Sequence, residues 1–511
     1  MIHTVARRIA DVVEHYGLWV LLALVLTEGV MLVAQACAKP FWHDEVYTIL
    51  ASGLPIVTLW RASLDGLDLA PPLNTILTRA AHALFSVGLV STRLPPMLGF
   101  GLASVVVFAM VRARANALIA IAAALIPCFS GAFPYAYEAR GYVVVLGLFA
   151  LAMFGWSESA AGRHRVRNLS LMAIALSAGV WTHYYAALAF LPIVVGELVR
   201  QRGGRRFDPA PWLALSAAAI GTLPLVPLVI AAAPQARTFW TRLEPSNLAS
   251  TYASVLGTLG TRRFALGGGT VAILVIGELI RRQRGGDRPS RSPKAREVKA
   301  HEVAAGLTTL AIPAMAMALG EGAGGPFAPR YVVFAVVGFA VVLPLAVWHL
   351  TPDHSLVALA LCLTLLLPFA TEAARSLAGA RLRSPNPLEI RPLLTQQLGS
   401  GSLALSAGLA YLQFWYYTPP TQRQRAVYVA DPRSELRTTG TDTIDRGYLA
   451  LARWTAVPVV DYDVFVREHR AFHVYACGSS WLSTRLRDER ASIDRVGYEF
   501  GCWLYRVRLP A

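Results

Sequence analysis

Apolar runs of about 18 or more residues recur along the first three quarters of this 511-residue chain, and each is long enough to cross a bilayer as a helix. Only 15% of the residues are charged, whereas soluble domains carry roughly 25%. The mean hydropathy of +0.47 points the same way. The sequence therefore predicts an α-helical polytopic membrane protein.

The basic residues lie mainly in short loops between the apolar runs, which is typical of cytoplasmic loops in membrane proteins. This distribution excludes a nucleic-acid partner despite the net charge of +16, and makes the lipid bilayer the expected surrounding. Arg7 and Arg8 precede the first apolar run at about 17–38, so we expect a cytoplasmic N-terminus.

Segment 73–87 decides the predicted topology, because it is apolar enough to resemble a span but contains Asn74, Arg79 and His82. We interpret it as an interfacial helix in the first outer loop. The Arg-rich loops then share one side, including the most basic loop at 281–299. The eleven predicted spans are 17–38, 94–111, 117–133, 141–156, two that turn at 182–185, 212–233, one ending near 281, one ending near 321, 331–351 and 356–369.

An odd number of spans places the C-terminus outside. We therefore predict a transmembrane domain at 1–371 and a periplasmic α/β domain at 372–511, in a protein of the bacterial inner membrane. Segments Ala426–Ala430 and 471–476 are typical of strands, and 481–490 is typical of a helix.

Two cysteines, Cys477 and Cys502, each adjoin a predicted strand of this polar domain. A disulfide is one interpretation, since an oxidising periplasm permits it. Two separate buried thiols are the other, because spacing alone does not fix the distance between them.

The acidic pair Asp44-Glu45 directly follows the first span, where partial desolvation raises a carboxyl pKa and favours general-base chemistry. A structural interpretation is equally open, in which Asp44 is the N-cap of a helix over 45–51.

Four further outer segments contain polar residues suited to a site. Each also has a structural interpretation: prolines that begin a helix, interfacial anchors, helix packing or a snorkelling arginine. The topology nevertheless places all of them on the acidic pair's side, and such a pocket suits an anionic lipid carrier and a hydroxyl or amine acceptor. The candidate residues are Asp68, Glu138, Arg140, His183, Tyr184 and Arg330.

The order of these features resembles the polytopic GT-C glycosyltransferases, a class that includes protein O-mannosyltransferases and lipid A aminoarabinose transferases. The resemblance covers about 38–200, with a weaker extension at Pro329-Arg-Tyr331. The motifs that carry it are Asp44-Glu45, Asp68-Leu-Ala-Pro-Pro72, Ser91-Thr-Arg-Leu-Pro-Pro96, Glu138-Ala-Arg-Gly-Tyr142 and Thr182-His-Tyr-Tyr185.

The resemblance implies transfer of a sugar from a polyprenyl-phosphate donor to a periplasmic glycan, lipid or protein. It implies that Asp44 is the catalytic base, with Glu45 orienting it and Glu138 as a further acid. The residues expected to bind substrate are Asp68, Arg93, Arg140, His183, Tyr184 and Arg330. A single displacement at the anomeric carbon would invert its configuration.

One departure from the pattern is Ala70, where many relatives have a histidine before the double proline. No clear ligand set for a divalent metal is present, so metal dependence stays open. A transporter or lipid flippase, a non-catalytic envelope scaffold, and a polysaccharide polymerase or ligase are the alternative functions.

Overall fold

The structure is a computed structural model of the whole chain. The residues that it describes are 2–203, 207–236, 238–241, 247–285, 297–323, 326–351, 354–379, 386–389, 391–398, 403–478 and 480–510.

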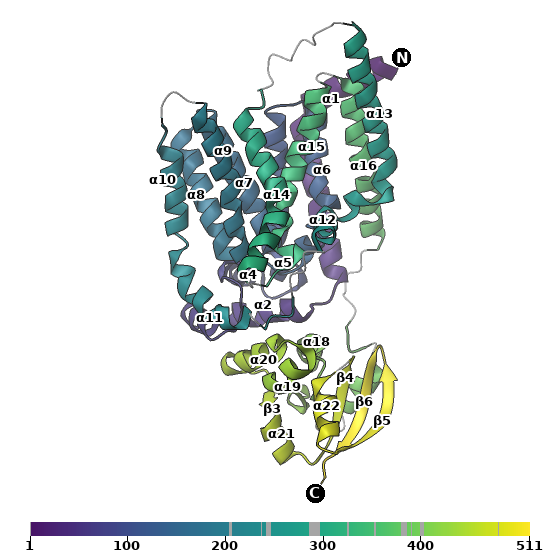
Figure 1. The fold of residues 1–511 in the computed structure, drawn as a ribbon. Helices are drawn as coiled ribbons and strands as arrows, with labels where there is room; N and C mark the ends of the chain where they lie inside the picture. Colours follow the sequence, from purple (N-terminus) through teal and green to yellow (C-terminus); the bar gives the residue numbers. More distant parts are fainter. Residues whose placement is uncertain are drawn as a thin grey trace.

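A bundle of long helices forms most of the molecule (Figure 1). Within the described residues, eight helical stretches are long and apolar enough to cross a membrane. The bundle helices are α1 (Ile2–Ala38), α5 (Leu89–Arg112), α6 (Ala117–Leu125), α7 (Tyr142–Ala160), α8 (Arg165–Thr182), α9 (Phe190–Arg202), α10 (Ala210–Ile220), α11 (Val226–Ala236), α13 (Arg262–Gly285), α14 (Ala300–Ala323), α15 (Val336–Leu350) and α16 (Ser355–Ala378). The predicted polytopic helical architecture is confirmed.

The three predicted spans outside these eight stretches are helical but shorter or less apolar. The third corresponds to the short apolar stretch Ala117–Phe129, and the fifth and sixth to α8 and α9. Eleven spans therefore stays a prediction. The basic loop at 281–299 lies largely outside the described residues.

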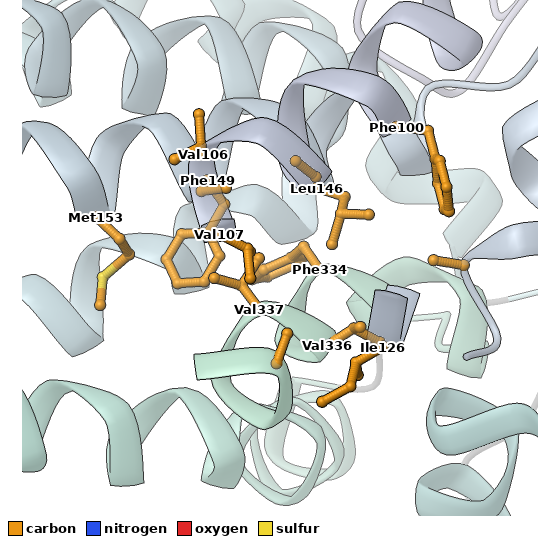
Figure 2. Packing of buried hydrophobic residues seen from close by; sticks show 14 of the residues in the cluster. Phe100, Val106, Val107, Ile126, Leu146, Phe149, Met153, Phe334, Val336 and Val337 are labelled. Carbon is orange, nitrogen blue, oxygen red and sulfur yellow. The ribbon is translucent and has the colours of Figure 1, made fainter. Parts of the chain in front are cut away.

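The centre of the bundle is a single large cluster of buried apolar side chains, among them Phe100, Phe149 and Phe334 (Figure 2). Helices α5 and α7 pack backbone against backbone there. A Cβ atom on Gly147 would lie 2.4 Å from the carbonyl oxygen of Gly99, so any larger residue would force the helices apart.

The first outer loop folds into three short helices, α2 (His43–Gly53), α3 (Ile56–Leu64) and α4 (Leu73–Phe85). Figure 1 shows α2 and α4 at the end of the bundle that faces the C-terminal domain. Helix α4 occupies the segment predicted to be an interfacial helix. It turns polar side chains inward, including Asn74 and Thr78, which are buried.

The C-terminal domain is an α/β unit, as predicted. Its six-stranded sheet has the order β3-β2-β1-β4-β6-β5, parallel from β3 to β4 and antiparallel beyond. Its elements are α17 (Pro392–Leu398), β1 (Leu403–Leu405), α18 (Gly408–Tyr417), β2 (Ala426–Ala430), α19 (Pro432–Thr439), α20 (Thr443–Trp454), β3 (Val459–Asp461), α21 (Tyr462–Glu468), β4 (Ala471–Cys477), α22 (Trp481–Asp488), β5 (Ser492–Glu499) and β6 (Cys502–Arg508).

Both predicted strands and the predicted helix of this domain are present as β2, β4 and α22. Helix α16 continues to Ala378, past the predicted boundary at 371, and the division into two domains stays a prediction. The helix does not stop where the apolar run stops, since its backbone hydrogen bonds continue through the polar residues that follow.

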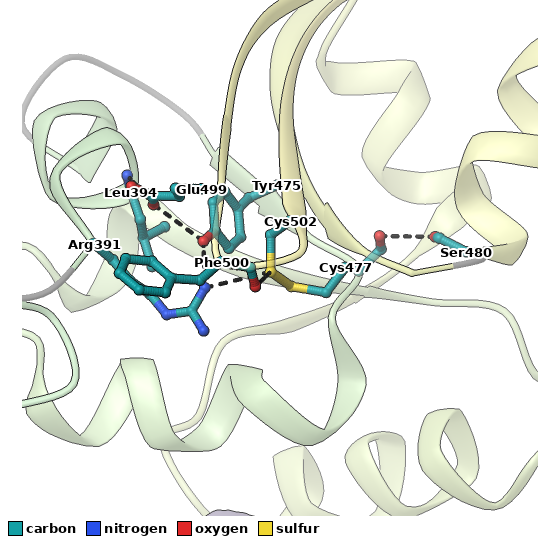
Figure 3. The surroundings of a disulfide bond; sticks show 9 residues. Arg391, Leu394, Tyr475, Cys477, Ser480, Glu499, Phe500 and Cys502 are labelled. Atoms are coloured by element: carbon teal, nitrogen blue, oxygen red, sulfur yellow. Dashed lines mark hydrogen bonds between the residues drawn. A yellow bond between two sulfur atoms is a disulfide. The ribbon is translucent and has the colours of Figure 1, made fainter.

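The two predicted-strand cysteines form a disulfide (Figure 3). Cys477 and Cys502 lie directly opposite each other on β4 and β6. Arg391 Nη1 donates a hydrogen bond to the Cys502 sulfur and another to the Tyr475 hydroxyl. Of the two interpretations left open by spacing, pairing is therefore the one found.

The domain is attached to the first outer loop by a shared hydrophobic core. One cluster of buried side chains contains Phe41, Val46 and Leu59 from the first outer loop together with Tyr411 and Leu412 from α18. The opposite face of the sheet has a separate cluster under α21 and α22. The first outer loop is therefore enclosed between the bundle and the C-terminal domain.

Candidate active site

The site begins at α2, whose first turn carries the acidic pair. Glu45 Oε2 accepts a hydrogen bond from the Trp42 backbone N–H at 3.4 Å, so Glu45 supplies the capping-box contact at the helix start. Asp44 lies within the first turn and is not the N-cap, which is Trp42. This frees its carboxylate for another role.

Glu45 and Arg93 form a fully buried, bidentate ion pair. Arg93 Nε lies 2.6 Å from Glu45 Oε1, and Arg93 Nη2 lies 2.7 Å from Glu45 Oε2. Arg93 also donates to the carbonyl oxygens of Ala36, Lys39 and Pro40. Its side chain has no exposed surface, so it does not face the site as the resemblance implied, and instead ties the end of α1 to α5.

The backbone of Ala139 is fixed from both sides by the outer loop. Its N–H donates to Glu45 Oε1 at 3.0 Å, and its carbonyl accepts from Thr48 Oγ1 at 3.1 Å and Asn74 Nδ2 at 3.4 Å. These contacts position the neighbouring residues Glu138 and Arg140 against α2 and α4.

Arg140 lies between two carboxylates. Its Nε is 3.8 Å from Asp44 Oδ2 and its Nη1 is 3.9 Å from Asp68 Oδ2. These separations are longer than hydrogen bonds. The guanidinium therefore attracts both carboxylates electrostatically without forming a hydrogen bond to either. All three side chains are partly exposed.

Asp68 has an unusual electrostatic setting. Its Oδ1 accepts the Ala70 backbone N–H at 3.0 Å. Burial raises the pKa of the Asp68 carboxyl, and Arg140 and the Ala70 N–H lower it only in part. Burial, followed by the charge of Asp68, raises the pKa of Tyr184 to about 12, which places this phenol near the same carboxyl.

Glu138 forms an ion pair with Lys39, the residue that follows α1. Burial raises the pKa of Glu138, and the ammonium of Lys39 opposes this rise. Glu138 is therefore held apart from Arg140, in a pair of its own at the edge of the acid–arginine cluster of Asp44, Asp68 and Arg140.

His183 lies in an aromatic group beside this cluster. Its ring centroid is 5.4 Å from that of Tyr142 and 4.8 Å from that of Tyr331. Burial, Arg140 and Arg330 lower the pKa of His183 to about 3, so the imidazole is neutral. Its Nδ1 accepts the Tyr185 N–H at the start of η3 (Tyr184–Ala189), which assigns it a capping role.

Arg330 lies in η7 (Pro329–Ala335), over the rings of Tyr142, Trp240 and Tyr331. It lines a cavity of about 470 Å³ together with Thr241. Arg330 Nε and Thr241 Oγ1 are both buried without a hydrogen-bond partner among the described residues. A guanidinium that lines a cavity suits an anionic ligand.

The structure thus gathers most of the predicted site residues at one end of the bundle and removes Glu45 and Arg93 from direct contact with a ligand. Lys39 and Trp240 were missed. Lys39 carried a signal, because it is one of only three lysines in an arginine-rich chain and directly follows the first span. Trp240 carried no such signal in the sequence, because its partner Arg330 is distant in sequence.

Metal ligands do not converge in the described residues, where no group of three or more His, Cys, Asp or Glu side chains is placed to hold an ion. Asp44 and Asp68 both face the Arg140 guanidinium, which is the wrong neighbour for a cation. The residues present therefore do not fit a metal between these two acids.

The helical bundle and the appended α/β domain together have the GT-C glycosyltransferase fold of a polytopic membrane protein. Over nearly its whole length the chain is similar to ArnT from Cupriavidus metallidurans in the apo state, with a TM-score of 0.58 and 13% identity, covering 95% of this chain and 97% of that chain. The predicted fold is confirmed.

The structure of ArnT from Cupriavidus metallidurans bound to undecaprenyl phosphate is also similar, with a TM-score of 0.53 and 13% identity. The match covers 96% of this chain and 97% of that chain. The oligosaccharyltransferase of Archaeoglobus fulgidus in complex with Zn and sulfate has a TM-score of 0.44 and 11% identity, covering 89% of this chain and 68% of that chain. No protein-family model and no curated protein matches the sequence.

Proposed function

We propose that this chain is a membrane glycosyltransferase that moves a sugar from a polyprenyl-phosphate donor to an acceptor outside the cytoplasmic membrane. The observation that carries the proposal is the cluster of Asp44, Asp68 and Arg140 at one end of a bundle whose fold matches ArnT along both chains. The match of the ArnT structure that contains undecaprenyl phosphate supports a lipid-phosphate donor.

Asp44 is the proposed catalytic base. Its side chain accepts no hydrogen bond within the described residues, and Arg140 Nε lies 3.8 Å from its Oδ2. The acceptor hydroxyl or amine attacks the anomeric carbon and gives its proton to Asp44. The bond from that carbon to the phosphate oxygen breaks, and the lipid phosphate leaves with the electron pair. One displacement inverts the anomeric centre.

Arg330 is the proposed binding residue for the donor phosphate. Arg330 and Thr241 line the cavity, and the oxygens of a phosphate bound there would accept hydrogen bonds from the guanidinium. The positive charge stabilises the phosphate as negative charge develops on it during transfer. His183, which is neutral, and the tyrosines around it supply surfaces that bind without competing for that charge.

The orientation in the membrane follows from the basic loops. We propose a bacterial inner-membrane protein with a cytoplasmic N-terminus and a periplasmic C-terminal domain, so that a periplasmic glycan, lipid or protein is the acceptor. Figure 1 is consistent with this arrangement, because the N-terminus and the C-terminal domain lie at opposite ends of the bundle.

The test is transfer of radiolabelled sugar from a polyprenyl-phosphate donor by membranes that contain Asp44→Asn. Asp65→Asn is the matched control, because Asp65 is an exposed acid of the same outer loop. We expect loss of transfer by at least about a hundredfold in the first variant only, which corresponds to the lower end of the usual general-base contribution. Near-normal transfer by a folded Asp44→Asn protein would exclude Asp44 as the base.

A further inference from the structure

Helix α2 has two occupied sides. On one side, Glu45 and Thr48 contact the bundle through Arg93 and Ala139. On the other side, its partners belong to the C-terminal domain. The acid Asp44 lies between these sides, so its position depends on both.

The segment before and through α2 makes repeated hydrogen bonds to α18. The Phe41 backbone N–H donates to Tyr417 Oη at 2.9 Å, and Gln413 Nε2 donates to the Phe41 carbonyl at 2.8 Å. These two bonds hold the chain directly before the helix against the C-terminal domain.

The helix itself is held by α20. Tyr47 Oη donates to the carbonyl of Gly447, and His43 Nδ1 lies 3.1 Å from Tyr448 Oη. Tyr448 Oη already donates its only proton to the Gly408 carbonyl at 2.5 Å. The hydrogen bond between Tyr448 and His43 is therefore donated by the imidazole, which assigns its proton to Nδ1.

His43 and Tyr448 are both buried, so neither side chain has water as an alternative partner. Burial lowers the pKa of His43, so the ring is neutral and its Nδ1–H has this one described acceptor. Loss of the tyrosine oxygen would leave a buried donor unpaired next to Asp44.

We propose that Tyr448 is a positioning residue for Asp44 and that it acts through its hydrogen bond to His43. The C-terminal domain is then part of the catalytic apparatus. This inference rests on the proposed function for its effect on transfer. Its structural part, that Tyr448 restrains the first turn of α2, stands without it.

The test compares Tyr448→Phe with Tyr411→Phe. Both tyrosines are fully buried in the same cluster and each loses only a hydroxyl. Tyr411 Oη donates a hydrogen bond within the C-terminal domain, to the Pro458 carbonyl at 2.7 Å. Of the two tyrosines, Tyr448 is the one whose hydroxyl accepts a hydrogen bond from α2, through His43. We expect Tyr448→Phe to lower kcat about tenfold, because small displacements of a catalytic group are costly.

The KM for the lipid-linked donor should stay within about twofold, since Arg330 and its cavity are untouched. Tyr411→Phe should leave both constants nearly unchanged. Tyr47→Phe, which loses the bond to Gly447, should lower kcat in the same direction and serves as a second variant for the same side of the helix.

Hydrogen–deuterium exchange over 41–53 in the full-length protein provides a readout independent of transfer. We expect Tyr448→Phe to speed exchange of these amides and Tyr411→Phe to leave them at the wild-type rate. Equal changes in both variants, or none in Tyr448→Phe, would overturn the positioning role. If the wild type transfers no sugar, the proposed function fails, and exchange alone decides whether Tyr448 restrains α2.

Discussion

Arg93 and Glu45 meet through two nitrogens and two oxygens, at 2.6 and 2.7 Å, with no exposed surface on either side chain. The pair joins α5 to α2, and Arg93 Nη1 donates to carbonyl oxygens at the end of α1 and directly after it. The first outer loop is therefore fixed to the bundle by an ion pair that is inaccessible to a ligand.

Replacing Glu45 by Gln should destabilise the protein strongly, because it leaves the Arg93 charge buried without a counter-charge. Loss of one partner of a buried pair costs about 3–5 kcal/mol. Glu14→Gln is the control, since Glu14 pairs with Arg112 in a largely exposed position and should change stability by less than about 1 kcal/mol. Denaturant unfolding in detergent measures the difference, and equal effects would contradict this role.

Arg330→Lys should raise the KM for the lipid-linked donor about tenfold or more, while leaving the fold intact. An ammonium keeps the charge but loses the planar guanidinium that lies over Trp240 and Tyr142. Arg423→Lys, which removes a similar stacked guanidinium from Trp415 in the C-terminal domain, is the matched control. A KM unchanged in Arg330→Lys would argue against phosphate binding there.

Glu435 should make the C-terminal domain less stable as pH rises. Burial and then the nearby charge of Asp445 raise the pKa of Glu435 to about 8, from 4.5 in the unfolded chain. Between these values the folded state holds a proton that the unfolded state releases, so stability falls as pH increases from 4.5 to 8.

Glu435→Gln imitates the protonated form, and its amide oxygen still accepts the Asp445 N–H. We expect exchange protection over 432–454 to be close to wild type at acidic pH and greater than wild type at alkaline pH. The exposed Glu468→Gln controls for the loss of one carboxylate. An alkaline gain of the same size in both variants would refute a specific effect of Glu435.

Reduction of the disulfide should destabilise the C-terminal domain by about 2–4 kcal/mol, because Cys477–Cys502 restricts the unfolded chain across a separation of 25 residues. Unfolding of the domain, followed with and without a reductant, measures this difference. Cys477→Ser/Cys502→Ser should remove the sensitivity to the reductant, whereas Cys362→Ser, which changes a free thiol, should keep it.

The bundle was predictable because the length of each apolar run in the local sequence indicates whether that run can cross a membrane. The position of Asp44 beside Arg140 was predictable in part, since alternation of the spans assigns both to one side. The span count was less accessible. Helices such as α9, which packs against α14, need not be as apolar or as long as isolated spans.

The pairing of Glu45 with Arg93 could not be predicted, because the two residues are separated by 48 positions and nothing local distinguishes a buried arginine from one that faces a ligand. The docking of the C-terminal domain was beyond local patterns for the same reason. Tyr47 and Gly447, for example, meet across 400 positions of sequence. Such contacts depend on the tertiary fold.

The core shared by the first outer loop and the C-terminal domain also has a consequence for biosynthesis. Ribosomes complete residues 41–67 long before residues 403–451, so Phe41, Val46 and Leu59 lack their apolar cover during most of translation. Exposed apolar surface of this kind promotes misassembly. A product truncated before the last domain would keep this apolar surface exposed permanently. The first outer loop therefore needs the final quarter of the chain to bury its apolar side chains.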